Sequence, residues 1–82
     1  MGTWVNMPRE VRVAVDASGE PRSIARDGGG WEVSRVQNRW RVDDGWWSGE
    51  TSRMYYQLLL RDGAVITVFR DLLTGKWYRQ HY

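Results

Sequence analysis

The chain has 82 residues, no cysteine, one histidine and a formal net charge of +2. This length allows one domain, and the absence of cysteine excludes disulfides and cysteine-containing metal sites. One histidine cannot supply a histidine cluster, and the charge is too small to indicate a histone-like nucleic-acid binder. A domain this small needs large buried side chains for its stability, and six Trp, four Tyr and one Phe can supply them.

Hydropathy along the chain indicates a protein that does not enter a membrane. No apolar run exceeds three residues, as at 58–60, which is far too short for a transmembrane helix. The N-terminus lacks the basic region and apolar core of a signal peptide. We therefore expect a cytoplasmic protein with a lead-in over residues 1–8 and a single β domain over residues 9–82.

Two short strands are predicted in the first third of the domain. Residues 10–16 alternate, with Val11, Val13 and Val15 on one face, which is typical of a half-buried strand. Residues 22–26 form a shorter run that ends in a glycine-rich segment at 27–30. This segment has neither the lysine nor the following helix of a phosphate-binding loop, so we interpret it as a turn.

A tryptophan-rich stretch over residues 31–47 changes its alternation part-way along. Trp31 and Val33 share one parity, whereas apolar residues after them take the other, which predicts a β-bulge near Ser34–Arg35. Beyond the bulge we expect one face to carry Val36, Trp40 and Val42, and the opposite face to carry Arg35, Gln37, Arg39 and Arg41. Adjacent residues of a strand point to opposite sides, so at most one of Trp46 and Trp47 can enter the same core.

The sequence Asp62-Gly63 between two apolar runs predicts a β-hairpin. Closure by a two-residue turn would pair Tyr56 with Phe69 and Leu60 with Val65. Residues 71–75 then form a connection in which Gly75 takes a positive φ, and a last strand covers residues 76–82. A helix over residues 51–60 is the alternative, but the hairpin turn and the Tyr-Tyr pair favour a strand.

Together these elements predict an all-β fold of five or six antiparallel strands, in a strongly bent sheet or a small SH3-like barrel. The predicted core contains Val11, Val13, Ile24, Val33, Val36, Trp40, Val42, Tyr56, Leu58, Leu60, Val65 and Phe69.

Few residues of the chain could carry out catalysis. No serine lies in a nucleophile-elbow sequence, and a catalytic triad would have to use His81, one residue from the end of the chain. Asp43, Asp44 and Glu50 could form a carboxylate pair or a divalent-cation site, but exposed acids in a turn beside arginines account for them more simply. We therefore predict no enzymatic activity, no cofactor and no metal site.

Arginines interleaved with aromatic residues are typical of proteins that bind single-stranded nucleic acid, in which cations contact phosphates and rings stack on bases. Lys76 is the only lysine among the 12 basic residues, and arginine favours planar, bidentate contacts. The candidate residues for binding DNA or RNA are Arg35, Arg39, Arg41, Trp46, Trp47, Tyr78 and Arg79.

The same pattern is compatible with two alternatives. Most tryptophans could lie in the core while the arginines form a solvated face, with their number set by genome composition. Alternatively, the domain could be a protein-interaction module that binds a peptide through an aromatic groove or a sheet edge.

Three phrases carry a resemblance to a known family: WEVSRVQNRWRVDDGWW, Y-Y-x-L-x-L-x-D-G and VFRDLLTGKWYRQHY. They resemble a small bacterial domain of unknown function, found alone and at the C-terminus of mutagenesis proteins similar to Y-family polymerases. The resemblance covers about residues 11–82. It implies an accessory binding role in DNA repair or translesion synthesis, with a DNA-repair protein as a further candidate partner. It assigns no site residues, and this chain contains no polymerase portion.

Overall fold

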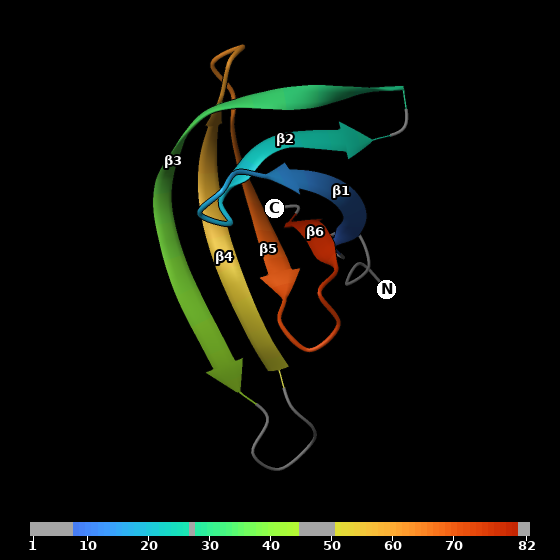
Figure 1. Ribbon diagram of the computed structural model, residues 1–82, viewed down its shortest axis with the longest axis vertical. Helices are drawn as coiled ribbons and strands as arrows, with labels where there is room; N and C mark the ends of the chain where they lie inside the picture. Colours follow the sequence, from blue (N-terminus) through green and yellow to red (C-terminus); the bar gives the residue numbers. More distant parts are fainter. Residues whose placement is uncertain (1–7, 27, 45–50, 81–82) are drawn as a thin grey trace, which may run out of the picture.

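The computed structural model describes residues 8–26, 28–44 and 51–80. These residues contain six strands and no helix (Figure 1). The strands are β1 (Arg9–Val15), β2 (Pro21–Arg26), β3 (Gly29–Asp44), β4 (Thr51–Leu60), β5 (Val65–Asp71) and β6 (Trp77–Gln80). The lead-in predicted over residues 1–8 lies outside the described residues, apart from Pro8.

The six strands form a closed antiparallel barrel in which each strand pairs with its neighbours in sequence and β1 closes on β6. Strand β3, with 16 residues, is long enough to belong to two parts of the barrel. Its beginning pairs with β2, whereas its remainder bends away and pairs with β4 (Figure 1). The all-β prediction is therefore confirmed, with six strands. Nothing in the described part of the chain forms a helix able to span a bilayer.

The interior of the barrel holds one cluster of buried side chains. Its members are Ile24, Tyr56, Leu58, Leu60, Ile66, Val68 and Trp77, with Val11, Val13, Trp31, Val33, Val36 and Met54 packed against them. Val11, Val13, Ile24, Val33, Val36, Tyr56, Leu58 and Leu60 were predicted to lie there, so most of the predicted core is confirmed. Trp77 was not part of the predicted core.

The hairpin between β4 and β5 exists, but its predicted register is wrong by one residue. Leu60 N–H donates to Ala64 O over 2.8 Å, and Gly63, with φ of 92°, donates to Leu60 O over 3.0 Å. The loop therefore has three residues and contains a glycine in the left-handed region, a common alternative to the two-residue turn. One extra residue in the loop reverses the faces of β5 relative to the prediction.

The consequence for the core is an exchange of side chains on β5. Ile66 and Val68 enter the barrel, whereas Val65 is 50% exposed. Phe69 is buried, with 2% of its surface exposed, but it pairs with Tyr55 on the outer face of the sheet and is not in the barrel cluster.

Strand β3 contains two bulges where the sequence predicted one. The register shifts between Val33 and Arg35, as predicted, and again between Val36 and Asn38. The second bulge reverses the faces once more. Arg39 is consequently opposite the core residue Tyr56, on the inner face.

The predicted faces beyond Val36 are therefore wrong. Trp40 and Val42 were expected in the core, but they lie on the outer face opposite Tyr55 and Arg53. Trp40 is 37% exposed.

Candidate binding site on strand β3

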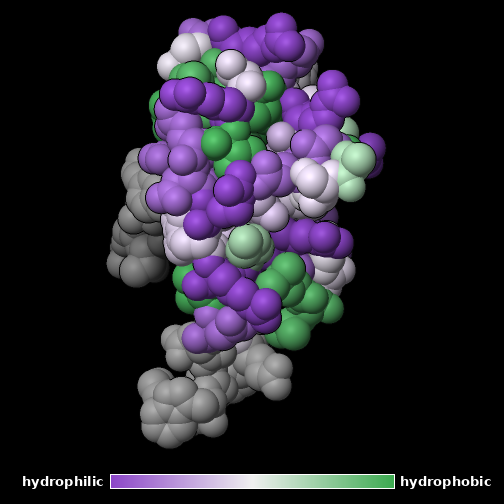
Figure 2. All heavy atoms as spheres, turned by 60° about the vertical axis from the view of Figure 1, so that its left-hand side comes forward, coloured by the Kyte–Doolittle hydropathy of each residue, from purple (hydrophilic) through white to green (hydrophobic). Residues whose placement is uncertain are grey.

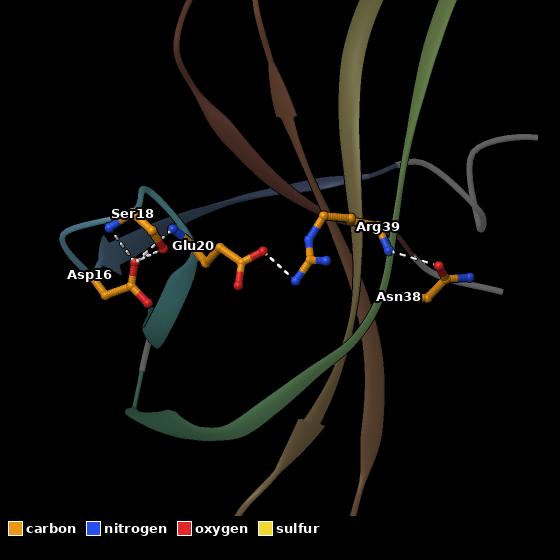
Figure 3. A network of polar contacts seen from close by, with 5 residues as sticks. All are labelled: Asp16, Ser18, Glu20, Asn38 and Arg39. Carbon is orange, nitrogen blue, oxygen red and sulfur yellow. Dashed lines mark hydrogen bonds and ion pairs between the residues drawn. The ribbon is translucent and has the colours of Figure 1, made fainter.

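Arg39 connects strand β3 to the turn between β1 and β2 (Figure 3). The carboxylate of Asp16 organises this turn, because its Oδ1 accepts hydrogen bonds from Ser18 N, Ser18 Oγ and Glu20 N at 2.9, 2.6 and 3.0 Å. The Ser18 hydroxyl is the main cause that lowers the pKa of Asp16, and the Glu20 amide adds to it. The turn thereby presents Glu20 to the Arg39 guanidinium, and the two side chains form an ion pair.

Arg41 also has an acidic partner within the protein. Its Nε donates to Asp43 Oδ2 over 2.8 Å, and its Nη2 lies 3.4 Å from Asp43 Oδ1 and from Ser52 Oγ. Ser52 Oγ donates to Asp43 Oδ1 over 2.7 Å. The Ser52 hydrogen bond, followed by that of Arg41, lowers the pKa of Asp43. A phosphate would have to compete with these carboxylates for both Arg39 and Arg41.

The predicted row of arginines is divided between the two faces of the sheet. Arg35 pairs with Leu59 on the outer face, whereas Arg39 pairs with Tyr56 on the inner face. Arg35 is exposed and has no ion-pair partner within residues 8–26, 28–44 and 51–80. The three guanidinium groups therefore do not form one continuous track for a phosphate backbone.

Four aromatic rings form a row across the outer face, one on each of four neighbouring strands. They are Trp40 on β3, Tyr55 on β4, Phe69 on β5 and Tyr78 on β6, and each is directly opposite the next. Successive ring centroids are 5.2, 5.0 and 5.2 Å apart, with interplanar angles of 8°, 39° and 23°. We call this set the aromatic row.

Most of the aromatic row packs against itself. The guanidinium of Arg53 covers Phe69 at 4.4 Å from the ring centroid and donates to Tyr55 Oη over 3.2 Å. Because the rings lie against one another, their faces are not open for bases to stack on in series. Trp40 differs, since it ends the row at β3 and is 37% exposed.

Strand β3 has one edge without a strand neighbour among the described residues. Pairing with β2 extends only from Gly29 to Glu32, and from Val33 onward β3 pairs with β4 alone. Figure 1 accordingly shows the lower part of β3 as the left-hand border of the barrel. Between Asn38 and Asp44 the register with β4 is unbroken, so this stretch is a regular strand. We call residues 38–44 the free edge.

Asn38 modifies the free edge at its start. Its Oδ1 accepts a hydrogen bond from the Arg39 N–H over 2.9 Å, and Figure 3 shows the two side chains pointing in opposite directions. A side chain thus satisfies one backbone donor of a strand segment for which the described residues supply no second neighbour. With the side to which β3 belongs turned forward, Figure 2 shows a mainly hydrophilic surface with separate hydrophobic spots. This surface does not resemble a broad apolar interface.

The remaining predicted binding residues have different positions. Tyr78 ends the aromatic row on β6, far from the free edge in strand order. Arg79 points inward, with its guanidinium 4.9 Å from the Trp31 ring centroid, and its buried Nε has no hydrogen-bond partner in the described part of the chain. Arg79 therefore contributes to the packing of the barrel. Trp46 and Trp47 lie outside the described residues.

Sequence reasoning missed the aromatic row as a unit and the free edge. A three-residue loop would have placed Tyr55 opposite Phe69, but the sequence does not distinguish it from the two-residue loop. The free edge has no local signal, since it depends on where β2 ends relative to β3.

Within the described ranges, no group of three His, Asp or Glu residues could hold a metal ion. Protein-family models, curated proteins and solved structures all give no significant match to the chain.

Proposed function

We propose that this domain is a non-enzymatic protein-interaction module that binds an extended segment of a partner along the free edge of β3. The single observation that carries this proposal is the bulge-free edge from Asn38 to Asp44, which has no strand neighbour among the described residues. Unpaired backbone groups of an edge strand can pair with an added strand, which is a common mode of peptide recognition. Seven residues at about 3.3 Å each provide roughly 23 Å of edge.

The charges near this edge favour a protein partner over nucleic acid. Arg39 and Arg41 each have a carboxylate partner, Glu20 and Asp43 respectively. In the described residues these pairs, and the position of Arg35 on the outer face, leave no row of free cations along the edge, whereas binding of nucleic acid depends on releasing counterions from several phosphates. Because the sequence resembles a domain of mutagenesis proteins, proteins of DNA repair are the first partners to test.

Binding by the full chain to two kinds of ligand separates the two classes of partner. Fluorescence anisotropy would be measured with a library of labelled strand-forming peptides and with a labelled single-stranded oligonucleotide, each at low and high salt. We expect some peptides to bind with a much weaker dependence on salt than contacts to several phosphates would give, and the oligonucleotide to bind weakly or not at all. Oligonucleotide binding that falls steeply with salt, without binding of any peptide, would support the nucleic-acid alternative instead.

A further inference from the structure

We infer that the edge binds an extended peptide with an aromatic residue opposite Trp40 and an acidic residue on each side of it. This inference rests on the proposed edge binding. The aromatic row and the alternation of the free edge carry this inference. The row supplies the aromatic preference, and the two arginines beside Trp40 supply the charge preference.

An added strand would lie next to the exposed end of the aromatic row. Neighbouring strands are about 4.8 Å apart, which is close to the observed spacing of the rings. The Trp40 and Tyr55 rings are nearly parallel, at 8°, with centroids 5.2 Å apart. A ring opposite Trp40 on the next strand would therefore continue the row by one member. Aromatic pairs in such offset arrangements attract each other beyond the area that they bury.

The residues on either side of Trp40 point to the inner face and are both arginines. The side chain of Arg39 is 49% exposed and that of Arg41 is 59% exposed, although each is paired with a carboxylate. On an added strand, the residues before and after the aromatic one would face Arg39 and Arg41. Glu20 and Asp43 use only part of the five N–H donors of each guanidinium, so an acidic residue opposite each arginine can accept from the remaining donors.

A second copy of this chain fits the edge poorly. If two β3 edges paired antiparallel about a two-fold axis at Trp40, then Trp40 would lie opposite its copy. The same register would place Arg39 opposite Arg41 twice, and like charges directly opposite destabilise a pair. A register that pairs Arg41 with Asp43 of the copy places the two-fold axis at Val42. In this register Trp40 no longer lies opposite the Trp40 ring of the copy. A different protein is therefore the occupant that satisfies both features.

The test uses the full chain and four matched nine-residue peptides of alternating threonine and valine. The parent peptide has a central tryptophan flanked by two glutamates. The second has alanine at the centre, the third has lysines in place of the glutamates, and the fourth is the parent with alternate backbone amides N-methylated. Dissociation constants are measured for the wild-type chain, for Trp40→Ala and Trp40→Phe, and for Val65→Ala, which truncates an exposed side chain on β5.

We expect the parent to bind at least about fivefold more tightly than the alanine-centred peptide, which corresponds to about 1 kcal/mol. This preference should disappear in Trp40→Ala and persist in Trp40→Phe and Val65→Ala. The lysine-flanked peptide should bind more weakly than the parent.

Two kinds of negative result remain distinguishable. Equal binding of the parent and the alanine-centred peptide, with the N-methylated peptide still inactive, would overturn the inferred sequence preference and leave edge binding intact. Equal binding of the parent and its N-methylated form, or no binding of any peptide, would overturn edge binding itself. If the free chain forms a dimer, and the dimer does not bind the peptides, then a second copy occupies the edge. This result would contradict the inference.

Discussion

Arg39 joins two parts of the barrel that are distant in sequence, because its guanidinium reaches from β3 to Glu20 of the β1–β2 turn. The sequence pattern predicted an outward arginine available to a ligand, but the second bulge turns this side chain inward. Its first role is therefore to hold the turn against the sheet. Both partners remain partly exposed, so water and salt limit the strength of the pair.

This pair predicts a small coupling in stability. Arg39→Gln and Glu20→Gln should each lower the free energy of unfolding by less than about 1 kcal/mol, and the double variant should show a coupling of roughly 0.2–1 kcal/mol. Chemical denaturation of the four proteins measures this coupling. A coupling of several kcal/mol would mean that Arg39 is far more structural than its exposure indicates.

Asp16 predicts a dependence of stability on acidic pH. Its folded-state pKa lies below the ordinary value of 3.8, so the ionised carboxylate stabilises the fold above that pH. This contribution is lost as the pH falls from the ordinary value through the lower folded-state pKa. Titration of the carboxyl carbons by NMR should show the low pKa in the wild-type chain.

The control for this titration is Ser18→Ala. It removes the main cause of the shift, so the pKa of Asp16 should rise toward its ordinary value. The pKa of Asp43, which depends on Ser52 and Arg41, should not change. An unchanged pKa of Asp16 in this variant would contradict the role assigned to the Ser18 hydroxyl.

Among the strands, those with simple alternation could be predicted from sequence, whereas side-chain direction next to bulges and turns could not. Val11 and Val13 were assigned correctly because β1 has no irregularity between them. Trp40 was assigned to the wrong face because a second bulge, at Gln37, follows the first by three residues. Val36, Trp40 and Val42 keep one parity across Gln37, so the sequence gives no sign of a second change of faces there.

The β4–β5 hairpin shows the same limit for turns. Asp62-Gly63 fits a two-residue loop and a three-residue loop equally well. The loop length decides which face of β5 points into the core. The arginines of the candidate site were misplaced for a different reason, the second bulge of β3. Arg35, Arg39 and Arg41 were grouped by parity, and the structure separates Arg35 from the other two.

The observed register of β5 makes a sharp prediction for two matched substitutions. Val68→Thr places a hydroxyl in the core, where Val68 is 0% exposed, and should cost roughly 1–3 kcal/mol of stability. Val65→Thr changes a half-exposed side chain and should stay within about 0.5 kcal/mol. Thermal or urea denaturation compares the two variants. The opposite order would support the two-residue turn and contradict the observed register.

At the scale of the whole molecule, closure of β1 on β6 allows a small domain to form a core without disulfides. The barrel interior and the aromatic row lie on opposite faces of the same sheet and share strands β4, β5 and β6. Tyr55 and Tyr56, which are adjacent in β4, contribute to one cluster each. If β4 separated from the sheet, side chains of both the core and the aromatic row would become exposed.

This arrangement predicts cooperative unfolding. The fluorescence of the six tryptophans, which include Trp40 in the row and Trp77 in the core, should change at the same urea concentration as the far-ultraviolet circular dichroism of the strands. Separate transitions would mean that the aromatic row is an independent unit outside the barrel. Phe69→Leu is a useful companion variant, since it should shift both transitions together.

The free edge is the feature from which the proposed function follows, and amide hydrogen exchange with and without the tryptophan-centred peptide tests it most directly. Successive N–H groups of an antiparallel strand point to opposite sides, so every second N–H of β3 points away from β4. We expect the peptide to slow exchange at alternate residues of 38–44, at those amides that do not already donate to β4, and to leave β1 and β6 unchanged. Protection centred on another strand, or no protection of residues 38–44 while the peptide is bound, would contradict edge binding.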